Sequence, residues 1–532
     1  MGETAVAVVK LGLALGAAAA WLLSSQGGGR GPSGRQVSER ARRGAGAVLA
    51  LCAVLSVGAY FQFGHLPAGF VHRWEMFHYY VGSKYHAELG YERLYRCSAV
   101  ADAEDGVPSN ERRMIRDLAD DNLVRAADVV ARAVAYPEAC RAHFSAARWS
   151  DFKQDVRFFR RGLGRKAWEQ AQLDHGYNPP PLWTATWGKL AAFVPASRWH
   201  LQLLAAADLV LMAGVLVALG LSFGWRTAAL GAVFWGTQAA SEVGWTGGGL
   251  GRQDWLFLCV ASLSLVHRQK FGWGGAALAL AGLLRLFPLL LLVGSGVVWL
   301  ARWHKGRGSQ AESRDGLALR RFALGAALAT SVGLGVSLAN GGGGDYREFW
   351  AHIQLRHEAI VNNHMGLRTL LSAAPLAVGE SVAGEAGAKS HEPSWVSERR
   401  DRLKELRAVY VAIVAAALAL IGAALWQARR VWVSVALSTA LIPLLLDPSN
   451  YYYSFFILLV PLAVQKRAVG VLLCVVGAGG QLLSLRFGAP ELRFAALSWL
   501  YVGVCLVVTL AFVRRPRAAF SWQRGSTCKA IG

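Results

Sequence analysis

The chain has 532 residues, of which 54% are hydrophobic and 20 are tryptophan, and its net charge is +22. Soluble domains seldom carry so many long apolar runs, so the composition excludes an ordinary soluble enzyme and indicates a membrane protein. The charge does not indicate nucleic-acid binding, because much of the excess lies in short loops between apolar runs, where the positive-inside rule already accounts for it.

Apolar segments long enough to cross about 30 Å of hydrocarbon recur along the chain. Candidate spans lie at residues 4–24, 45–63, 198–222, 226–244, 254–266, 271–302, 322–340, 407–426, 431–446, 451–465, 468–485 and 496–513. The first could be a signal peptide, but no convincing small-residue cleavage site precedes the linker after it, which favours a retained anchor. Basic loops flank both ends of 271–302, so this run must cross twice, as two helices meeting at residues 284–288.

The sequence therefore predicts an all-α polytopic protein with about 12 to 13 transmembrane helices, placed in the plasma (inner) membrane. Its basic loops are expected on the cytoplasmic side. The predicted divisions are an anchor and basic linker (1–44), a transmembrane core (45–340) that includes a large, mainly helical outer loop (64–197), a second outer loop (341–406), a C-terminal bundle (407–513) and a basic cytoplasmic tail (514–532).

The first outer loop contains two segments with a helical pattern. Residues 109–132 are rich in charge, and residues 148–172 alternate aromatic and basic side chains, as either an interfacial helix or a solvated helical subdomain would. Cys97 and Cys140 share this loop and either pair or remain thiols. The other cysteines that fall in apolar spans are expected in the core: Cys52, Cys259, Cys474 and Cys505.

Several polar residues stand where a membrane protein does not need them for stability. Glu75 follows an apolar span, and Arg285 interrupts an apolar run, which is costly unless it faces a polar cavity or pairs with Glu75 or Asp254. The second outer loop carries His357, Asn363, His364 and Arg368, which are either ligands for phosphate and sugar hydroxyls or plain surface groups. The tyrosines at 451–453 are interfacial anchors or carbohydrate contacts.

Five short elements follow one another along the chain. They are Glu75 with Tyr79 and Tyr80, Gly90 with Leu94 and Tyr95, Pro179 to Leu182, Ala281 and Gly282 with Arg285 and Pro288, and Asn450 to Tyr453. In this order they resemble the GT-C superfold of membrane glycosyltransferases. The resemblance is strongest to bacterial mannosyltransferases that use polyprenyl-phosphate-mannose. At the position of Glu75 this family usually carries Asp, so the chain departs from the pattern there.

The resemblance implies transfer of mannose or another hexose or pentose from a polyprenyl-phosphate donor to a hydroxyl of a lipid, glycan or protein acceptor on the outer face. It implies that Glu75 is the catalytic base and that Arg285 and Arg368 bind the donor phosphate. The residues expected to contact substrate are His78, Tyr79, Tyr80, His357, Asn363, His364 and Tyr452. No cofactor and no metal is expected.

Two other classes of protein share some of these features. A transporter or flippase also has many spans, a broken helix and an arginine within a span, although no inverted repeat is detectable here. A non-catalytic scaffold with the same fold is the third possibility. The chain has no nucleotide-binding loop in a suitable context, which favours a lipid-linked donor over a nucleotide sugar.

Overall fold

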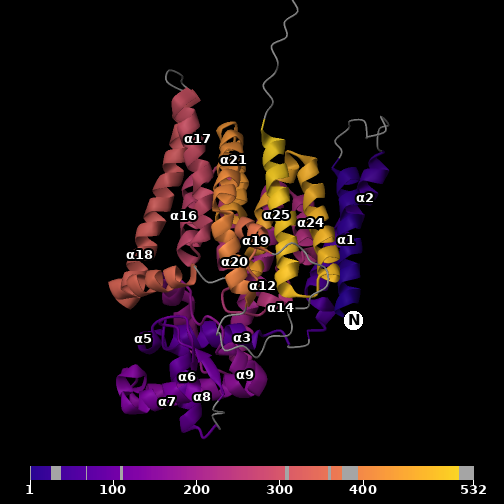
Figure 1. Cartoon of the computed structure of the whole chain (residues 1–532). Helices are drawn as coiled ribbons and strands as arrows, with labels where there is room; N and C mark the ends of the chain where they lie inside the picture. The colour runs from indigo at the N-terminus through magenta and orange to yellow at the C-terminus, as the bar shows by residue number, and fades with distance from the viewer. Residues whose placement is uncertain are drawn as a thin grey trace, which may run out of the picture.

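The computed structural model describes residues 2–25, 38–66, 69–107, 112–305, 311–357, 361–373 and 394–513. A bundle of long helices forms most of the molecule, and a compact subdomain built from residues 73–192 covers one end of the bundle (Figure 1). We call this end the subdomain end. Strands in the described part of the chain form one two-stranded antiparallel sheet, β1 (Met114–Arg116) with β2 (Leu123–Arg125).

In the part of the chain that the structure describes, eight segments of the bundle are long and apolar enough to span a membrane. They are α1 (Glu3–Ser24), α2 (Glu39–Tyr60), α12 (Arg198–Phe223), Phe287–His304 within η6 (Phe287–Leu291) and α17 (Leu292–Lys305), Gly316–Leu355 within α18 (Ala311–His357), α21 (Arg407–Trp426), α24 (Arg467–Arg486) and α25 (Pro490–Phe512). The protein is therefore a helical, multi-pass membrane protein.

Shorter apolar helices fill the interior of the bundle. They are α15 (Asp254–His267), α16 (Phe271–Leu284), the segment Val431–Leu445, built from α22 (Val431–Leu437), η7 (Ser438–Ala440) and α23 (Leu441–Leu445), and the 3₁₀ helix η8 (Asn450–Val464). Helix α13 (Trp225–Thr237) packs against α2 and α12. Because these helices are shorter than a full span, the predicted number of transmembrane helices stays a prediction.

The predicted break in the run 271–302 is present. Helix α16 ends at Leu284, Arg285 adopts an extended backbone (φ −150°, ψ 127°), and η6 begins at Phe287 with Pro288 in its first turn. Proline lacks an N–H and favours such a boundary, so the chain reverses here instead of continuing as one helix. The reversal places Arg285 at the subdomain end, on the wall of a cavity.

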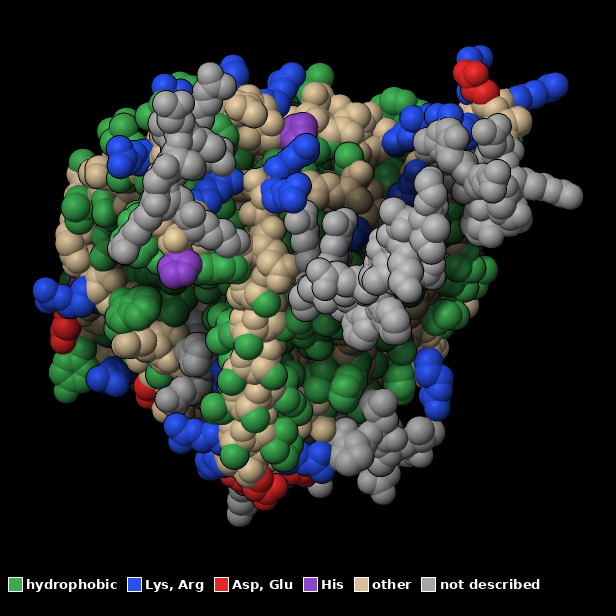
Figure 2. Space-filling view, turned by 90° about the horizontal axis from the view of Figure 1, so that it is seen from above, with side chains coloured by type: hydrophobic (Ala, Val, Ile, Leu, Met, Phe, Trp, Pro, Cys, Tyr) green, Lys and Arg blue, Asp and Glu red, His purple; other side chains and the backbone are tan. Residues whose placement is uncertain are grey.

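Basic side chains gather at the opposite end of the bundle. Figure 2 shows this end from above, with Lys and Arg side chains spread among apolar ones. Exposed residues here include Arg268, Lys270, Arg320, Arg321, Arg429, Arg430, Lys466 and Arg467. They come from four different connections, so the fold brings the predicted cytoplasmic loops to one side, as the positive-inside rule requires.

Helix α1 is an integral part of the bundle. It packs against α2 and α24, where Gly470 leaves no room for a side chain beside Trp21. Its buried Lys10 forms an ion pair with Glu242 (Nζ to Oε1, 3.1 Å). A charged residue within an apolar helix requires such a partner, so these contacts favour the interpretation of α1 as a retained span.

The subdomain has its own aromatic core. Its elements are α3 (Arg73–Met76), the π-helix η2 (Phe77–Val81), α4 (Gly82–Lys84), α5 (His86–Leu89), α6 (Leu94–Glu104), β1, β2, α7 (Ala126–Ala135), η3 (Pro137–Ala139), η4 (Arg141–His143), α8 (Ala146–Leu163), α9 (Arg165–Ala171), α10 (Pro181–Trp183), η5 (Thr184–Gly188) and α11 (Lys189–Ala192). Trp149, Phe152, Phe159 and Trp168 are buried in it. Helix α8 is therefore packed into the subdomain by its aromatic face, which favours the interpretation as a helical subdomain over that as an interfacial helix.

The predicted helix over 109–132 is only partly present. Residues 108–111 lie outside the described part, β1 and β2 form a hairpin, and a helix begins only at Ala126. The hairpin turn contains Asp120, Asp121 and Asn122, and Asp121 has a positive φ of 62°. Asp and Asn favour turns and tolerate this conformation, so local turn chemistry overrides the charge-rich helical pattern.

Cys97 and Cys140 form a disulfide with a Cα–Cα distance of 5.4 Å, which settles the alternative that the sequence leaves open. Because the bond closes a loop of 43 residues, the double substitution to Ala is expected to destabilise the subdomain by about 3–4 kcal/mol. The measurement is the melting temperature with and without reductant. The wild type should fall to the level of the double variant on reduction, and Cys52→Ala, which removes a free buried cysteine, should still respond. A wild-type melting temperature that ignores the reductant would contradict this prediction.

The second outer segment is more helical than predicted. Helix α18 bends at Gly342, whose φ is 75°, and its second half continues to His357 across the subdomain end of the bundle (Figure 1). The run of glycines at 341–344 permits this conformation without a side-chain clash. The remaining described elements are η1 (Gln62–Gly64), α14 (Val243–Thr246), α19 (Leu367–Ser372) and α20 (Ser394–Glu405); residues 374–393 lie outside the described part of the chain.

Candidate functional site

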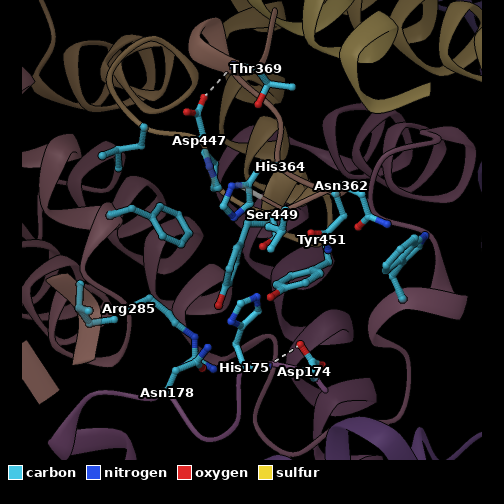
Figure 3. Close-up of a pocket in the computed structure, with 18 of the residues that line it drawn as sticks. Asp174, His175, Asn178, Arg285, Asn362, His364, Thr369, Asp447, Ser449 and Tyr451 are labelled. Carbon is cyan, nitrogen blue, oxygen red and sulfur yellow. Dashed lines mark hydrogen bonds between the residues drawn. The ribbon is translucent and has the colours of Figure 1, made fainter. Parts of the chain in front are cut away.

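A cavity of about 970 Å³ lies between the subdomain and the bundle. Its walls come from the start of α3, the segment 170–178, the break at 285–287, the second half of α18, the loop 361–372 and the connection 446–452. Figure 3 shows side chains from these segments converging, with Arg285 beside Asn178 and with Tyr451 near His175. Segments from most of the chain thus meet at one place.

Glu75 lies on the cavity wall, in the first turn of α3. The helix is capped by His72, whose Nδ1 accepts a hydrogen bond from the backbone N–H of Glu75 (3.2 Å) and whose Nε2 donates to the carbonyl of Gly244 (3.1 Å). Burial lowers the pKa of His72, which keeps its ring neutral in this capping role. This cap fixes the backbone position from which the Glu75 side chain extends.

The Glu75 carboxylate forms an ion pair with Arg252 (Oε2 to Nη1, 3.2 Å), and only 2% of the Arg252 side chain is exposed. The Arg252 guanidinium also lies over the rings of Tyr451 (4.5 Å) and Tyr79 (4.9 Å). Burial lowers the pKa of Arg252, but Glu75 and the surrounding tyrosines outweigh it, so the net pKa is raised. Arg252 therefore carries a permanent charge behind the Glu75 carboxylate.

Arg285 lies on the cavity wall at the break between α16 and η6, and it is 5% exposed. Its Nη1 donates to the carbonyl of Leu284 (2.8 Å), whereas its Nε and Nη2 have no hydrogen-bond partner among the described residues. Of the two alternative ion pairs, the one with Glu75 is not formed, because Glu75 pairs with Arg252. Asp254 and Arg285 interact electrostatically but are not within ion-pair distance. Buried donors that point at no protein acceptor suit an anionic ligand.

A second charged pair lies on the same cavity. Arg368 Nε is 3.4 Å from Asp447 Oδ2, and the backbone N–H of Thr369 donates to Asp447 Oδ1 (3.4 Å). Gly366 has a φ of 148° and packs directly against Asp447, so a side chain at position 366 would clash. The loop after α18 therefore turns back toward the bundle.

Burial raises the pKa of Asp447 to about 6, although Arg368 lowers it. A raised pKa in the folded state means that the contribution of this group to stability is complete below roughly pH 4 and is lost as the pH rises through about 6. The melting temperature of the wild type should therefore fall over this range relative to Asp447→Asn, by an effect of about 2 kcal/mol. A difference between the two proteins that stays constant from pH 4 to pH 7 would contradict this expectation.

The subdomain contributes a polar wall. Asp174 accepts hydrogen bonds from Trp74 Nε1 (2.7 Å) and from the backbone N–H of His175 (2.8 Å), and Asn178 Oδ1 accepts from the hydroxyl of Tyr79 (3.0 Å). Burial raises the pKa of Asp174, but His78 and His175 outweigh it, so the net pKa is lowered and the carboxylate is ionised. Carboxylate, amide and aromatic groups on one wall suit a polyhydroxylated ligand.

Six predicted residues share the cavity wall: Glu75, Arg285, Asn363, His364, Arg368 and Tyr452. Tyr451 lines it too, whereas Tyr453 is fully buried in the bundle. The side chain of His357 lies outside the described residues. The interfacial interpretation of the tyrosines therefore does not describe Tyr451 and Tyr452, which face the cavity.

Three predicted residues do not line the cavity. His78 is buried and contacts the hydroxyl of Tyr95 (2.7 Å) and the carbonyl of Ala171 (3.1 Å), and the hydroxyl of Tyr80 donates to the carbonyl of Val194. Tyr79 lies behind the wall, beside Arg252. The π-helix turns these side chains into the aromatic core, so the structure offers no support for substrate contact by His78 or Tyr80.

The cavity wall also contains polar and aromatic residues outside the predicted set, among them Trp74, Asp174 and His175. Trp74 directly precedes Glu75, and the acid and histidine stand just before the Pro-rich stretch at 179–181. Their position next to Glu75 and next to the Pro-rich stretch is the one feature of the sequence from which they could have been predicted. Arg252 gives no such signal, because its partner is 177 positions away in the chain.

The site contains no obvious metal centre, since no group of three or more His, Cys, Asp or Glu side chains in the described ranges could hold an ion. Comparison with known proteins does not place the chain in a family. No family model, no curated protein and no solved structure matches it.

Proposed function

We propose that the protein is a membrane glycosyltransferase of GT-C type, with about 12 to 13 transmembrane helices in the plasma membrane. It moves a sugar, mannose or another hexose or pentose, from a polyprenyl-phosphate donor to a hydroxyl of a lipid, glycan or protein acceptor on the outer face. The observation that carries the proposal is one cavity that holds both a carboxylate, Glu75, and a buried arginine with unpaired donors, Arg285.

These two groups match the two needs of the reaction. The acceptor hydroxyl attacks the anomeric carbon and gives its proton to the Glu75 carboxylate, while the bond from that carbon to the phosphate oxygen breaks. The polyprenyl phosphate leaves with the bonding electrons, and Arg285 stabilises the negative charge as it develops. Glu75 in place of the family's usual Asp reaches one methylene further and can serve the same role.

The shape and lining of the cavity also suit this ligand. Its volume of about 970 Å³ is at the upper end of ordinary ligand pockets, as a sugar phosphate with an acceptor requires. Trp74, Trp245 and Tyr451 offer aromatic faces beside amide and carboxylate groups. Such mixed surfaces bind sugars through ring stacking and hydrogen bonds to hydroxyls.

The surroundings of Arg285 favour a lipid-linked donor. Leu286, which caps η6, lines the cavity and is 37% exposed, and Leu289 in η6 and Val293 in α17 are exposed as well. In a membrane these side chains face lipid. An isoprenoid chain can therefore lie in the bilayer along η6 and α17, with its phosphate at Arg285.

The test is sugar transfer by the purified protein in lipid nanodiscs. The donors are a panel of polyprenyl-phosphate hexoses and pentoses, and the acceptors are membrane lipids, glycans and peptides. Transfer from one donor in the panel is the expected result, and it should stop in Glu75→Gln. A folded protein that transfers none of the sugars would contradict the proposal.

A further inference from the structure

We propose that Arg252 is a positioning residue that holds the Glu75 carboxylate ionised and in place, while Arg285 keeps its donors for the phosphate. The catalytic importance of these two roles rests on the proposed function. Which of the two buried arginines keeps Glu75 ionised is a property of the protein alone and can be tested without substrate.

Among the described residues, Glu75 at 3.2 Å is the one carboxylate within ion-pair distance of the Arg252 guanidinium. Asp208 and Asp254 act on it only from further away. The rings of Tyr79, Tyr451 and Tyr452 enclose the guanidinium, with centroids 4.9, 4.5 and 5.9 Å away. Aromatic faces stabilise a cation but supply no competing negative charge. The guanidinium is therefore held as a cation that faces the carboxylate.

The backbone of Arg252 is held just as firmly. Asp208 of α12 accepts hydrogen bonds from the backbone N–H groups of Arg252 (2.9 Å) and Gln253 (3.1 Å) through Oδ1. In addition, the N–H of His72 donates to the carbonyl of Gly248 (3.1 Å), which joins this loop to the residue that caps α3. Hydrogen bonds thus connect the backbone segments that carry Glu75 and Arg252, which fixes the relative positions of the two side chains.

The two arginines occupy different positions relative to the cavity. Each keeps two nitrogens without a hydrogen-bond partner among the described residues, Nε and Nη2 in Arg285 and Nη1 and Nη2 in Arg252. Arg285 lines the cavity, whereas Arg252 does not line it and lies against the rings of Tyr79 and Tyr451. The ring of Tyr79 lies near both guanidinium groups, at 4.9 Å from Arg252 and 5.9 Å from Arg285. A phosphate bound in the cavity would therefore lie beside Arg285 and not beside Arg252.

The titratable and charged groups that face Glu75 come from four segments. They are His72 on its own turn, Arg252 from the loop before α15, Tyr79 from η2, and Tyr451 with Tyr452 from η8. The capping role of His72 keeps it neutral, and the tyrosine hydroxyls are neutral at physiological pH. Arg252 is then the permanent charge in this set, so its loss should raise the pH at which Glu75 binds a proton.

The test compares Arg252→Met with Arg285→Met, two substitutions of the same chemistry at neighbouring buried arginines. The protonation of Glu75 is followed in nanodiscs by infrared difference spectroscopy during a pH titration, with Glu75→Gln identifying the band. We expect Arg252→Met to move the midpoint upward by about one to three pH units. Arg252→Lys should restore most of the shift, and Arg285→Met should move the midpoint by a clearly smaller amount.

In binding of a short-chain isoprenyl phosphate, we expect Arg285→Met to have the larger effect of the two variants. The dissociation constant should rise at least about tenfold in Arg285→Met and much less in Arg252→Met. An unchanged midpoint in Arg252→Met, or an equal midpoint shift in both variants, would overturn the inference. If Arg252→Met does not fold, Arg252→Gln, which is neutral and of similar polarity, takes the same test.

The outcome is separable from that of the proposed function. If the protein transfers no sugar but Arg252→Met still shifts the titration of Glu75, the positioning role stands and the enzymatic proposal fails. If it transfers sugar, the acid limb of the pH dependence of kcat/KM should move upward in Arg252→Met, with little change in KM for the donor. A loss of rate without that shift would indicate a merely structural role for Arg252.

Discussion

Replacing Glu75 by Gln should lower the rate of sugar transfer by a factor of about 10²–10⁴. The amide keeps the size of the side chain but cannot accept the proton of the acceptor hydroxyl. Donor affinity should change little, because the phosphate ligand proposed here is Arg285 and the Glu75 carboxylate faces Arg252. The measurement is kcat and donor KM in nanodiscs, with the donor that the wild type uses.

Two control variants make this prediction specific. Glu88→Gln removes a carboxylate that pairs with Arg148 in the subdomain (2.6 Å) and does not line the cavity, so transfer should persist. The melting temperature of Glu75→Gln must be followed as well, because the substitution leaves buried Arg252 without its ion-pair partner, at a cost of about 3 kcal/mol. A folded Glu75→Gln protein with wild-type kcat would exclude Glu75 as the base.

Replacing Arg285 by Met should reduce kcat/KM for the donor by a factor of about 10²–10³. Met fills much of the same volume in this buried position but offers no donor to the phosphate. Both binding and the rate should suffer, because the charge on the leaving phosphate grows as the bond breaks. Arg285→Lys should recover part of the loss, since Lys keeps the charge without the planar fork of donors.

The matched control is Arg320→Met, which removes an exposed arginine from α18 at the opposite end of the bundle. Transfer should be unaffected by this substitution. Equal losses in the two variants would point to a general effect of charge on the membrane protein. Unchanged kinetics in a folded Arg285→Met protein would remove the phosphate role from Arg285.

The membrane-spanning pattern and the break at residues 284–288 could be predicted from sequence because they rest on local quantities. The length of an apolar run decides whether it can span, and Arg285 with Pro288 marks where the run must turn. Glu75 and Arg368 stand out for a similar reason, since each is a charged group next to an apolar segment. These signals need no knowledge of which helices touch.

The local structure of the outer segments was harder to predict. Charge-rich residues before 126 form a hairpin, because the turn at Asp121 overrides the helical pattern. Likewise, η2 is a π-helix that carries His78 and Tyr80 into the subdomain core. The sequence shows aromatic residues there but does not show which of them face the cavity.

By itself, the sequence determined that the chain is a polytopic helical membrane protein, and it predicted that Glu75 and Arg285 lie at the same end of it. Only the tertiary structure decided which charges pair. Glu75 and Arg252 are 177 positions apart, and Asp447 meets Arg368 across 79 positions. Neither the hydrophobic periodicity of a segment nor the energetic cost of burying a single charge shows which residues meet over such separations, because these contacts form only when the helices pack.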